Sequence, residues 1–212
     1  MNNRDLKKYI ENEIFPLYSA NDEAHNLSHI MDVINRSFKL INENNLEVRP
    51  DMVYTVASYH DIGHHIDAKN HENISAKIMY EDEKLKQFFS DEELLIIKEA
   101  IEDHRASANA SPRSIYGKIV SSADRNNTVN QCLVRSYFYG RKLDPNASDQ
   151  ELYERAHGVL TKKFGIDGYA KHYFKDSEYE LFLKELRTLL ADKDKFCQQQ
   201  DTVIKELLQK KK

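Results

Sequence analysis

Apolar residues recur through most of this chain at intervals of three and four positions, which is the spacing of one face of an α-helix. One such series is formed by Ile30, Val33, Ile34, Phe38 and Ile41, and a second lies between residues 94 and 101. No stretch alternates convincingly between apolar and polar residues, as a half-buried strand does. The pattern therefore predicts an all-α fold.

Local signals indicate where several of these helices begin. Ser90 is followed three residues later by Glu93, which is typical of a capping box at a helix start. Ser148 and Glu151 repeat that spacing, and Pro50 marks the start of another helix. We predict helices over residues 3–18, 28–44, 51–60, 71–85, 91–103, 113–138, 149–163 and 177–208, the last of them interrupted.

Glycine and proline are scarce, with 6 and 4 among 212 residues, and this favours long helices because strands need turns that use these residues. The clearest breaks in the helical pattern lie at residues 104–112 and 140–148. We therefore expect a helical bundle built of an N-terminal helix over residues 1–21 that packs on the core, a core over residues 22–138, and an additional C-terminal helical layer over residues 149–212.

Charge and cysteine content narrow the function classes. The net charge of −4 gives no reason to expect a nucleic-acid duplex or a membrane as partner. Cys132 and Cys197 form neither a disulfide framework nor a zinc-binding spacing, which favours a reducing compartment. No stretch approaches the roughly 20 apolar residues of a membrane span. We expect a soluble, cytoplasmic protein and leave homo-oligomerisation open.

Seven of the nine histidines lie between residues 25 and 104, and the doublet His60-Asp61 closes an apolar, helix-like run over residues 52–59. Together with a downstream aspartate they form a series of nitrogen and oxygen donors without a thiolate: His29, His60, Asp61, His71, His104 and Asp124. Imidazole and carboxylate donors suit divalent ions that also bind water. Such an ion can activate water at neutral pH.

The predicted helices place most of these donors at helix ends, as in helical folds that build a metal site between helices. Adjacent helical residues point about 100° apart, so His60 and Asp61 are not expected to chelate side by side as an i,i+4 pair would. The Asp61 carboxylate can instead bridge two ions. The donors then divide into a first site (His29, His60, Asp61 and Asp124) and a second site (Asp61, His71 and His104).

Each donor also has an ordinary structural interpretation when taken alone. A histidine at a helix end often caps that helix, His60 could be a core residue, and Asp124 could pair with the adjacent Arg125. His157 and His172 lie outside the series, and we interpret both as structural. The combined pattern is what favours a metal centre.

The same residues resemble the HD superfamily of metal-dependent phosphohydrolases. The matching positions are His29 in HNLSHI, His60-Asp61 in HDIGHH and Asp124 in SSADR, and the resemblance covers roughly residues 22–130. His71 in HENISA and His104 in EDHRA look like the two further histidines of the two-metal branches. The resemblance implies an HD-domain-like all-α bundle, one or two divalent ions (Mn, Fe, Mg, Co or Ni), and hydrolysis of phosphate esters, often of nucleotides.

Subfamily signatures do not select a substrate. The chain lacks the glycine- and phenylalanine-rich stretch of deoxynucleoside triphosphate triphosphohydrolases, the GYP segment of cyclic-dinucleotide phosphodiesterases, and the glutamate-aspartate pair of alarmone hydrolases. The HNLSHI segment looks most like small stand-alone bacterial HD hydrolases.

Our hypothesis is hydrolysis of a phosphate ester or anhydride in a nucleotide or similar small phosphorylated metabolite. Asp61 would orient the attacking hydroxide, and His64 would protonate the leaving oxygen or hold phosphate. His25, Arg105 and Arg125 are the candidate substrate contacts, since guanidinium groups match phosphate geometry. Two alternatives stay open: an HD-fold di-iron oxygenase, and a non-catalytic nucleotide-binding regulatory module.

Overall fold

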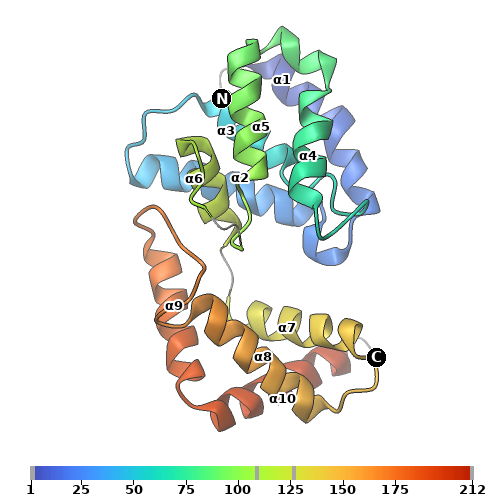
Figure 1. Cartoon of the computed structure of the whole chain (residues 1–212), viewed down its shortest axis with the longest axis vertical. Helices are drawn as coiled ribbons and strands as arrows, with labels where there is room; N and C mark the ends of the chain where they lie inside the picture. The colour runs from blue at the N-terminus through green and yellow to red at the C-terminus, as the bar shows by residue number, and fades with distance from the viewer. Residues whose placement is uncertain (1–2, 108–109, 126–127, 211–212) are drawn as a thin grey trace. The chain divides into compact units, whose positions relative to one another are not determined.

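The computed structural model describes residues 3–107, 110–125 and 128–210, and these residues form helices and connecting segments without a strand (Figure 1). The α-helices are α1 (Arg4–Tyr9), α2 (Leu27–Glu43), α3 (Pro50–Tyr59), α4 (His71–Tyr80), α5 (Asp91–Glu102), α6 (Ile115–Asp124), α7 (Val129–Leu143), α8 (Asp149–Phe164), α9 (Ser177–Leu190) and α10 (Lys193–Lys210). A π-helical stretch (Ile10–Ile14) and a 3-10 helix (Phe15–Ala20) continue α1, and short 3-10 helices cover Glu23–His25 and Glu83–Gln87. The all-α prediction is confirmed.

The described residues separate into two compact units, each with its own hydrophobic core. One unit contains residues 3–125 together with 172–175, and the other contains residues 128–171 and 176–210. Within the first unit, α3 is the central helix, and every residue from Asp51 to Tyr59 is buried. Helices α2, α5 and α6 all pack against it. This burial explains why the α3 sequence is apolar on all sides.

The N-terminal helices belong to the core of the first unit. Leu6, Ile10 and Tyr18 are almost completely buried there. The hydroxyl of Tyr18 donates to the carbonyl oxygen of Ser58 at 2.8 Å, close to the end of α3. The segment before α2 is therefore anchored at the end of α3, next to the His60-Asp61 doublet.

The second unit is built from α7 to α10, with Phe164, Leu186 and Phe196 in its core. Capping boxes start α7 and α8, and the α8 box is the predicted Ser148–Glu151 pair. Helix α7, which the sequence analysis placed in the 22–138 core, packs against α8 and α10 in this unit. The predicted domain limits themselves stay a prediction.

The prediction of one continuous helix over residues 113–138 is wrong. Helix α6 ends at Asp124, and α7 starts after Thr128, whose side chain accepts a hydrogen bond from the backbone of Gln131 at 3.2 Å. The predicted helix over 71–85 is also too long, because α4 ends at Tyr80. The interruption expected within 177–208 is confirmed between α9 and α10.

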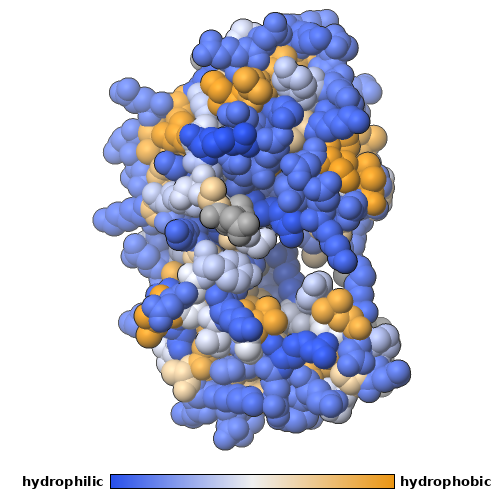
Figure 2. All heavy atoms as spheres, in the orientation of Figure 1, coloured by the Kyte–Doolittle hydropathy of each residue, from blue (hydrophilic) through white to orange (hydrophobic). Residues whose placement is uncertain are grey.

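The surface is largely polar, in agreement with a mean hydropathy of −0.72. Figure 2 shows a displayed face that is mainly hydrophilic, with separate apolar patches. Within the described ranges, no helix combines the length and apolarity that crossing a membrane requires.

Candidate metal centre

The donors of the first predicted site come from three helix ends. His29 lies in the first turn of α2, where the side chain of Asn26 accepts a hydrogen bond from the His29 backbone at 3.2 Å. His60 and Asp61 follow the last turn of α3, and Asp124 is the last residue of α6. The contacts of α2 and α6 with α3 bring these ends together.

The donors of the second predicted site come from α4 and α5, which pack against each other. His71 is the first residue of α4, and His104 lies two residues after the end of α5. The Nε2 atoms of these two histidines are 3.2 Å apart. The serine hydroxyl of Ser121 on α6 donates to the carbonyl oxygen of His104 at 2.7 Å, so α6 also supports this site.

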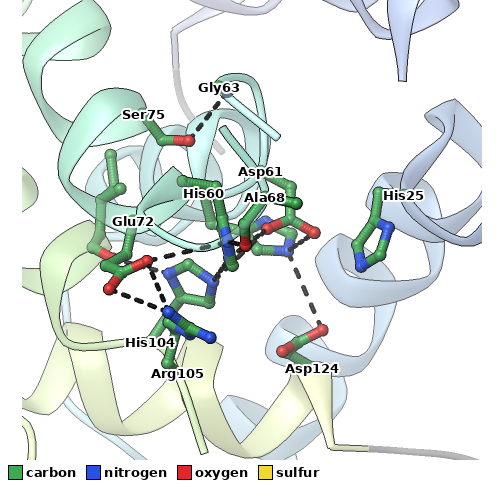
Figure 3. Close-up of polar contacts among 12 residues, drawn as sticks. His25, His60, Asp61, Gly63, Ala68, Glu72, Ser75, His104, Arg105 and Asp124 are labelled. Carbon is green, nitrogen blue, oxygen red and sulfur yellow. Dashed lines mark hydrogen bonds and ion pairs between the residues drawn. The ribbon is translucent and has the colours of Figure 1, made fainter. Parts of the chain in front are cut away.

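Asp61 stands between the two sets of histidines. Figure 3 labels it together with His60, His104 and Asp124. Its Oδ2 atom lies 3.5 Å from His29 Nε2 and 3.4 Å from His60 Nε2. Its Oδ1 atom lies 3.2 Å from His71 Nε2 and 3.5 Å from His104 Nε2. Each oxygen of one buried carboxylate therefore faces its own histidine pair, which is the arrangement that a bridging carboxylate requires.

Asp124 adds an oxygen to the first set. Its Oδ1 atom lies 3.1 Å from His29 Nε2 and 4.0 Å from His60 Nε2. Two ligands bound to one ion at about 2.1 Å are separated by roughly 3.0–3.4 Å in octahedral or tetrahedral geometry. The donor separations around Asp61 are close to this range, so small side-chain movements suffice for coordination.

Hydrogen bonds fix the tautomers of three of the histidines. The Nδ1 atoms of His60, His71 and His104 lie 2.8, 3.0 and 2.7 Å from the carbonyl oxygen of the residue three positions earlier. A carbonyl oxygen only accepts, so each Nδ1 carries the hydrogen. In the neutral imidazole each Nε2 atom then presents its lone pair toward Asp61, as in metal sites whose ligand histidines donate their other N–H to a second group.

These nitrogen atoms fit a bound cation. The Nε2 atoms of His29 and His60 are buried and have no hydrogen-bond partner of acceptable geometry among the described residues. The Nε2 atoms of His71 and His104 lie 3.2 Å apart, and both also face Asp61 Oδ1. Buried polar atoms are normally satisfied. A divalent ion on each side of Asp61 would satisfy all four nitrogens.

The charges of the site also favour a cation. Burial raises the pKa of Asp61, but His60 and the other surrounding imidazoles outweigh it and hold the pKa well below its usual range. The pKa of Asp124 is likewise low, because His29 outweighs the effect of burial. Burial lowers the pKa of His29, but the carboxylates of Asp124 and Asp61 raise it to about 10. Both carboxylates are ionised at neutral pH, and they attract a proton or a metal ion.

His25 and His64 lie together beside this centre. Their rings are stacked, with centroids 3.6 Å apart and an interplanar angle of 19°, and the His64 ring lies 5.2 Å from that of His71. His25 Nδ1 is 2.7 Å from an Asp22 oxygen. Burial and the neighbouring His25 lower the pKa of His64 to about 4, so the imidazole is neutral at pH 7.

Asp22, His25 and His64 also lie close enough to be considered as metal ligands. Imidazole nitrogens bind an ion in the plane of the ring, and stacked rings share no such plane. One ion therefore cannot bind both imidazoles in the observed arrangement. Asp22 was missed in the sequence analysis; its position three residues before His25 in a 3-10 turn is the signal that could have indicated it.

The two candidate arginines both contact protein groups. Arg105 Nη1 lies 3.2 Å from each carboxylate oxygen of Glu72 (Figure 3). It also donates to the carbonyl oxygen of Lys69 at 2.7 Å. Arg125 is buried, its Nη1 donates to the carbonyl oxygen of Ser121 at 2.7 Å, and its guanidinium carbon lies 5.8 Å from the ring centroid of Tyr173. A phosphate contact of either arginine stays a prediction.

His157 and His172, the two histidines outside the series of donors that were expected to be structural, lie close to backbone carbonyl oxygens. His157 Nε2 lies 2.9 Å from the carbonyl oxygen of Leu190, and His172 Nδ1 lies 2.8 Å from that of Phe174. These contacts agree with the structural roles expected for both.

Comparison with known proteins gives a family for the region that carries these donors. Residues 26–127 match the family model described as "HD domain", and this interval contains all six donor residues, Asp61 included. Among solved structures, the chain is similar to a predicted HD superfamily hydrolase from an uncultured Thermotogales bacterium, with a TM-score of 0.50 and 19% sequence identity. That match covers 90% of this chain and 98% of the other. At 19% identity it shows a similar fold and no more. A comparison with curated proteins gave no match.

Proposed function

Because this chain is an HD-domain protein in which four imidazoles and a second carboxylate gather around Asp61, we propose that it is a metal-dependent phosphohydrolase acting on a nucleotide or a similar small phosphorylated metabolite. The observation that carries the proposal is the position of Asp61, whose two oxygens face two separate histidine pairs. A bridged pair of ions suits the displacement of a group from phosphorus, since it can bind both the attacking and the leaving oxygen.

In this proposal His29, His60, Asp61 and Asp124 would hold one divalent ion. Asp61, His71 and His104 would hold the second. When bound, such ions activate water and offset the negative charge of a phosphate group. The nitrogen-rich donor set is compatible with Mn, Fe, Co or Ni, and the carboxylates also with Mg.

The chain's own residues would orient the reactants. Asp61 is held rigidly by burial among histidines, and its ionised carboxylate would keep the attacking oxygen in place. His64 lies next to the second donor set and would donate an N–H hydrogen bond to a phosphate or leaving oxygen. His25, oriented by Asp22, would contact the same substrate phosphate group, and Arg105 and Arg125 are further proposed contacts.

The test is phosphate release from a panel of nucleotides and simple phosphomonoesters by the manganese-loaded protein. Asp61→Asn should abolish release, because it removes the charge and the bridging oxygen at once. Asp51→Asn is the matched control, since Asp51 is also buried but lies at the opposite end of α3. Undiminished turnover by a folded Asp61→Asn protein would contradict the proposal.

A second candidate function, an HD-fold di-iron oxygenase, is supported by the same bridged arrangement of donors. Oxygen uptake by the ferrous protein in the presence of an organophosphonate or polyol would distinguish it from a hydrolase. If the protein instead binds a nucleotide tightly without any turnover, it is a regulatory module. The proposal also includes a cytoplasmic location, which the two free, buried cysteines support.

A further inference from the structure

We propose that Glu72 and Arg105 form a positioning clamp that holds His71 and His104 at the separation needed to bind the second divalent ion. The inference rests on the six-donor centre of the proposed function. In the clamp both residues act through the histidines, and the substrate contact considered for Arg105 above is the alternative that the experiment distinguishes.

The clamp links the residue that follows His71 to the residue that follows His104. Glu72 directly follows His71, and Arg105 directly follows His104. Arg105 Nη1 lies 3.2 Å from both carboxylate oxygens of Glu72, and it also donates to the carbonyl oxygen of Lys69 at 2.7 Å. One guanidinium group therefore holds the backbone before His71 and the side chain after it (Figure 3).

The contact between Arg105 and Glu72 constrains the distance between the chain segments that carry His71 and His104, which the hydrogen bonds of the two imidazole rings do not. The Nδ1 bonds of His71 and His104 end on carbonyl oxygens three residues earlier in the chain, so they fix each ring against its own helix end. They leave the distance between the two helix ends undetermined. The Nε2 atoms must nevertheless stay about as close as the observed 3.2 Å to share an ion.

Partial burial strengthens the ion pair between Arg105 and Glu72. The side chains of Arg105 and Glu72 are 32% and 17% exposed, so the pair is partly sheltered from solvent. Glu72 Oε2 also lies 3.8 Å from His71 Nδ1, on the side of the ring that carries the hydrogen. A negative group in this position increases the basicity of the ligand histidine, as outer carboxylates do in metal sites.

The chain offers a closely matched control at the other end of α5. Arg49 forms an ion pair with Glu93 in the first turn of that helix, and its Nη2 donates to the carbonyl oxygen of Phe88 at 2.9 Å. Its side chain is 38% exposed. Arg49→Gln therefore removes the same kind of contact from the same helix, far along the sequence from His104.

The experiment is stepwise calorimetric titration of the metal-free protein with Mn²⁺, with ion content measured separately by plasma mass spectrometry. The variants are Glu72→Gln, Arg105→Gln, the charge exchange Glu72→Arg with Arg105→Glu, and the control Arg49→Gln. Circular dichroism confirms that each is folded. No substrate is needed, so the result is independent of turnover.

We expect each single variant at the clamp to weaken binding of the ion at the second site by about tenfold or more. The ion at the first site should bind as in wild type. The charge exchange should recover part of the loss, and Arg49→Gln should match wild type. Unchanged binding of the second ion in both single variants, or equal weakening of both ions, would overturn the clamp alone. If Arg105→Gln binds both ions as wild type does and only raises KM in the separate phosphate-release assay, the clamp is likewise overturned and Arg105 is a substrate contact. A wild-type protein that binds one ion would overturn both the clamp and the six-donor centre.

Discussion

Binding of the first ion should strengthen steeply as pH rises, because a proton and a metal ion compete for His29. In the metal-free protein, Asp124 Oδ1 and Asp61 Oδ2 lie 3.1 and 3.5 Å from His29 Nε2, and they raise the pKa of this imidazole to about 10. The nitrogen is therefore protonated at neutral pH. It must lose that proton before it can bind an ion.

The magnitude follows from the size of the shift. With a pKa of about 10, roughly one His29 in a thousand is deprotonated at pH 7. The apparent affinity for the first ion should therefore rise about tenfold for each pH unit in this range. A histidine with the usual pKa of about 6.5 would give almost no change above pH 7.5.

The assay is a titration with Mn²⁺ at about pH 6.5, 7.5 and 8.5, in buffers of different ionisation enthalpy so that proton release is counted directly. One proton released per first ion, with an affinity that rises across the series, is the expected result. Asp124→Asn is the informative variant, because it removes a carboxylate that raises the pKa of His29. It should bind less tightly but with a weaker pH dependence. An affinity that does not change between pH 7.5 and 8.5 would refute the assignment of His29 as a protonated ligand residue.

Three further predictions concern catalysis and stability. His64→Ala should lower kcat by about 10²-fold or more with unchanged ion content, because it removes a hydrogen-bonding group beside the second donor set; unchanged kcat with a panel substrate would contradict its role. Ile97→Ala should cost about 2–5 kcal/mol of unfolding free energy, since this α5 residue is completely buried, and a midpoint shift in urea unfolding measures it. Thr128→Ala should cost about 1 kcal/mol by removing the cap of α7, and an unchanged unfolding midpoint would show that the cap contributes nothing.

The fold class was predictable because it depends on local signals. Apolar spacing located α2 and α5, and the Ser90–Glu93 and Ser148–Glu151 pairs gave the starts of α5 and α8. The break after Asp124 was missed because apolar residues continue on both sides of a short polar segment. Thr128 and Gln131 do form a capping box there, but that spacing is weaker evidence inside an apparently continuous helix.

The chemistry of the site was predictable only in part. The donor types and their order along the chain suggested two sets that share Asp61. The pairing of each carboxylate oxygen with a particular histidine pair depends on how α2, α4, α5 and α6 pack around α3, and no local pattern contains that information. The contact between Glu72 and Arg105 joins residues 33 positions apart for the same reason. Tertiary packing therefore determines which donor residues face each oxygen of Asp61.

The most direct test of the metal centre is anomalous diffraction at the manganese edge from crystals of the manganese-loaded protein. Two peaks are expected, one between Asp61 Oδ2 and the imidazoles of His29 and His60, and one between Asp61 Oδ1 and the imidazoles of His71 and His104. Both peaks should disappear in Asp61→Asn. Manganese bound only elsewhere, or no peak beside Asp61, would contradict the account.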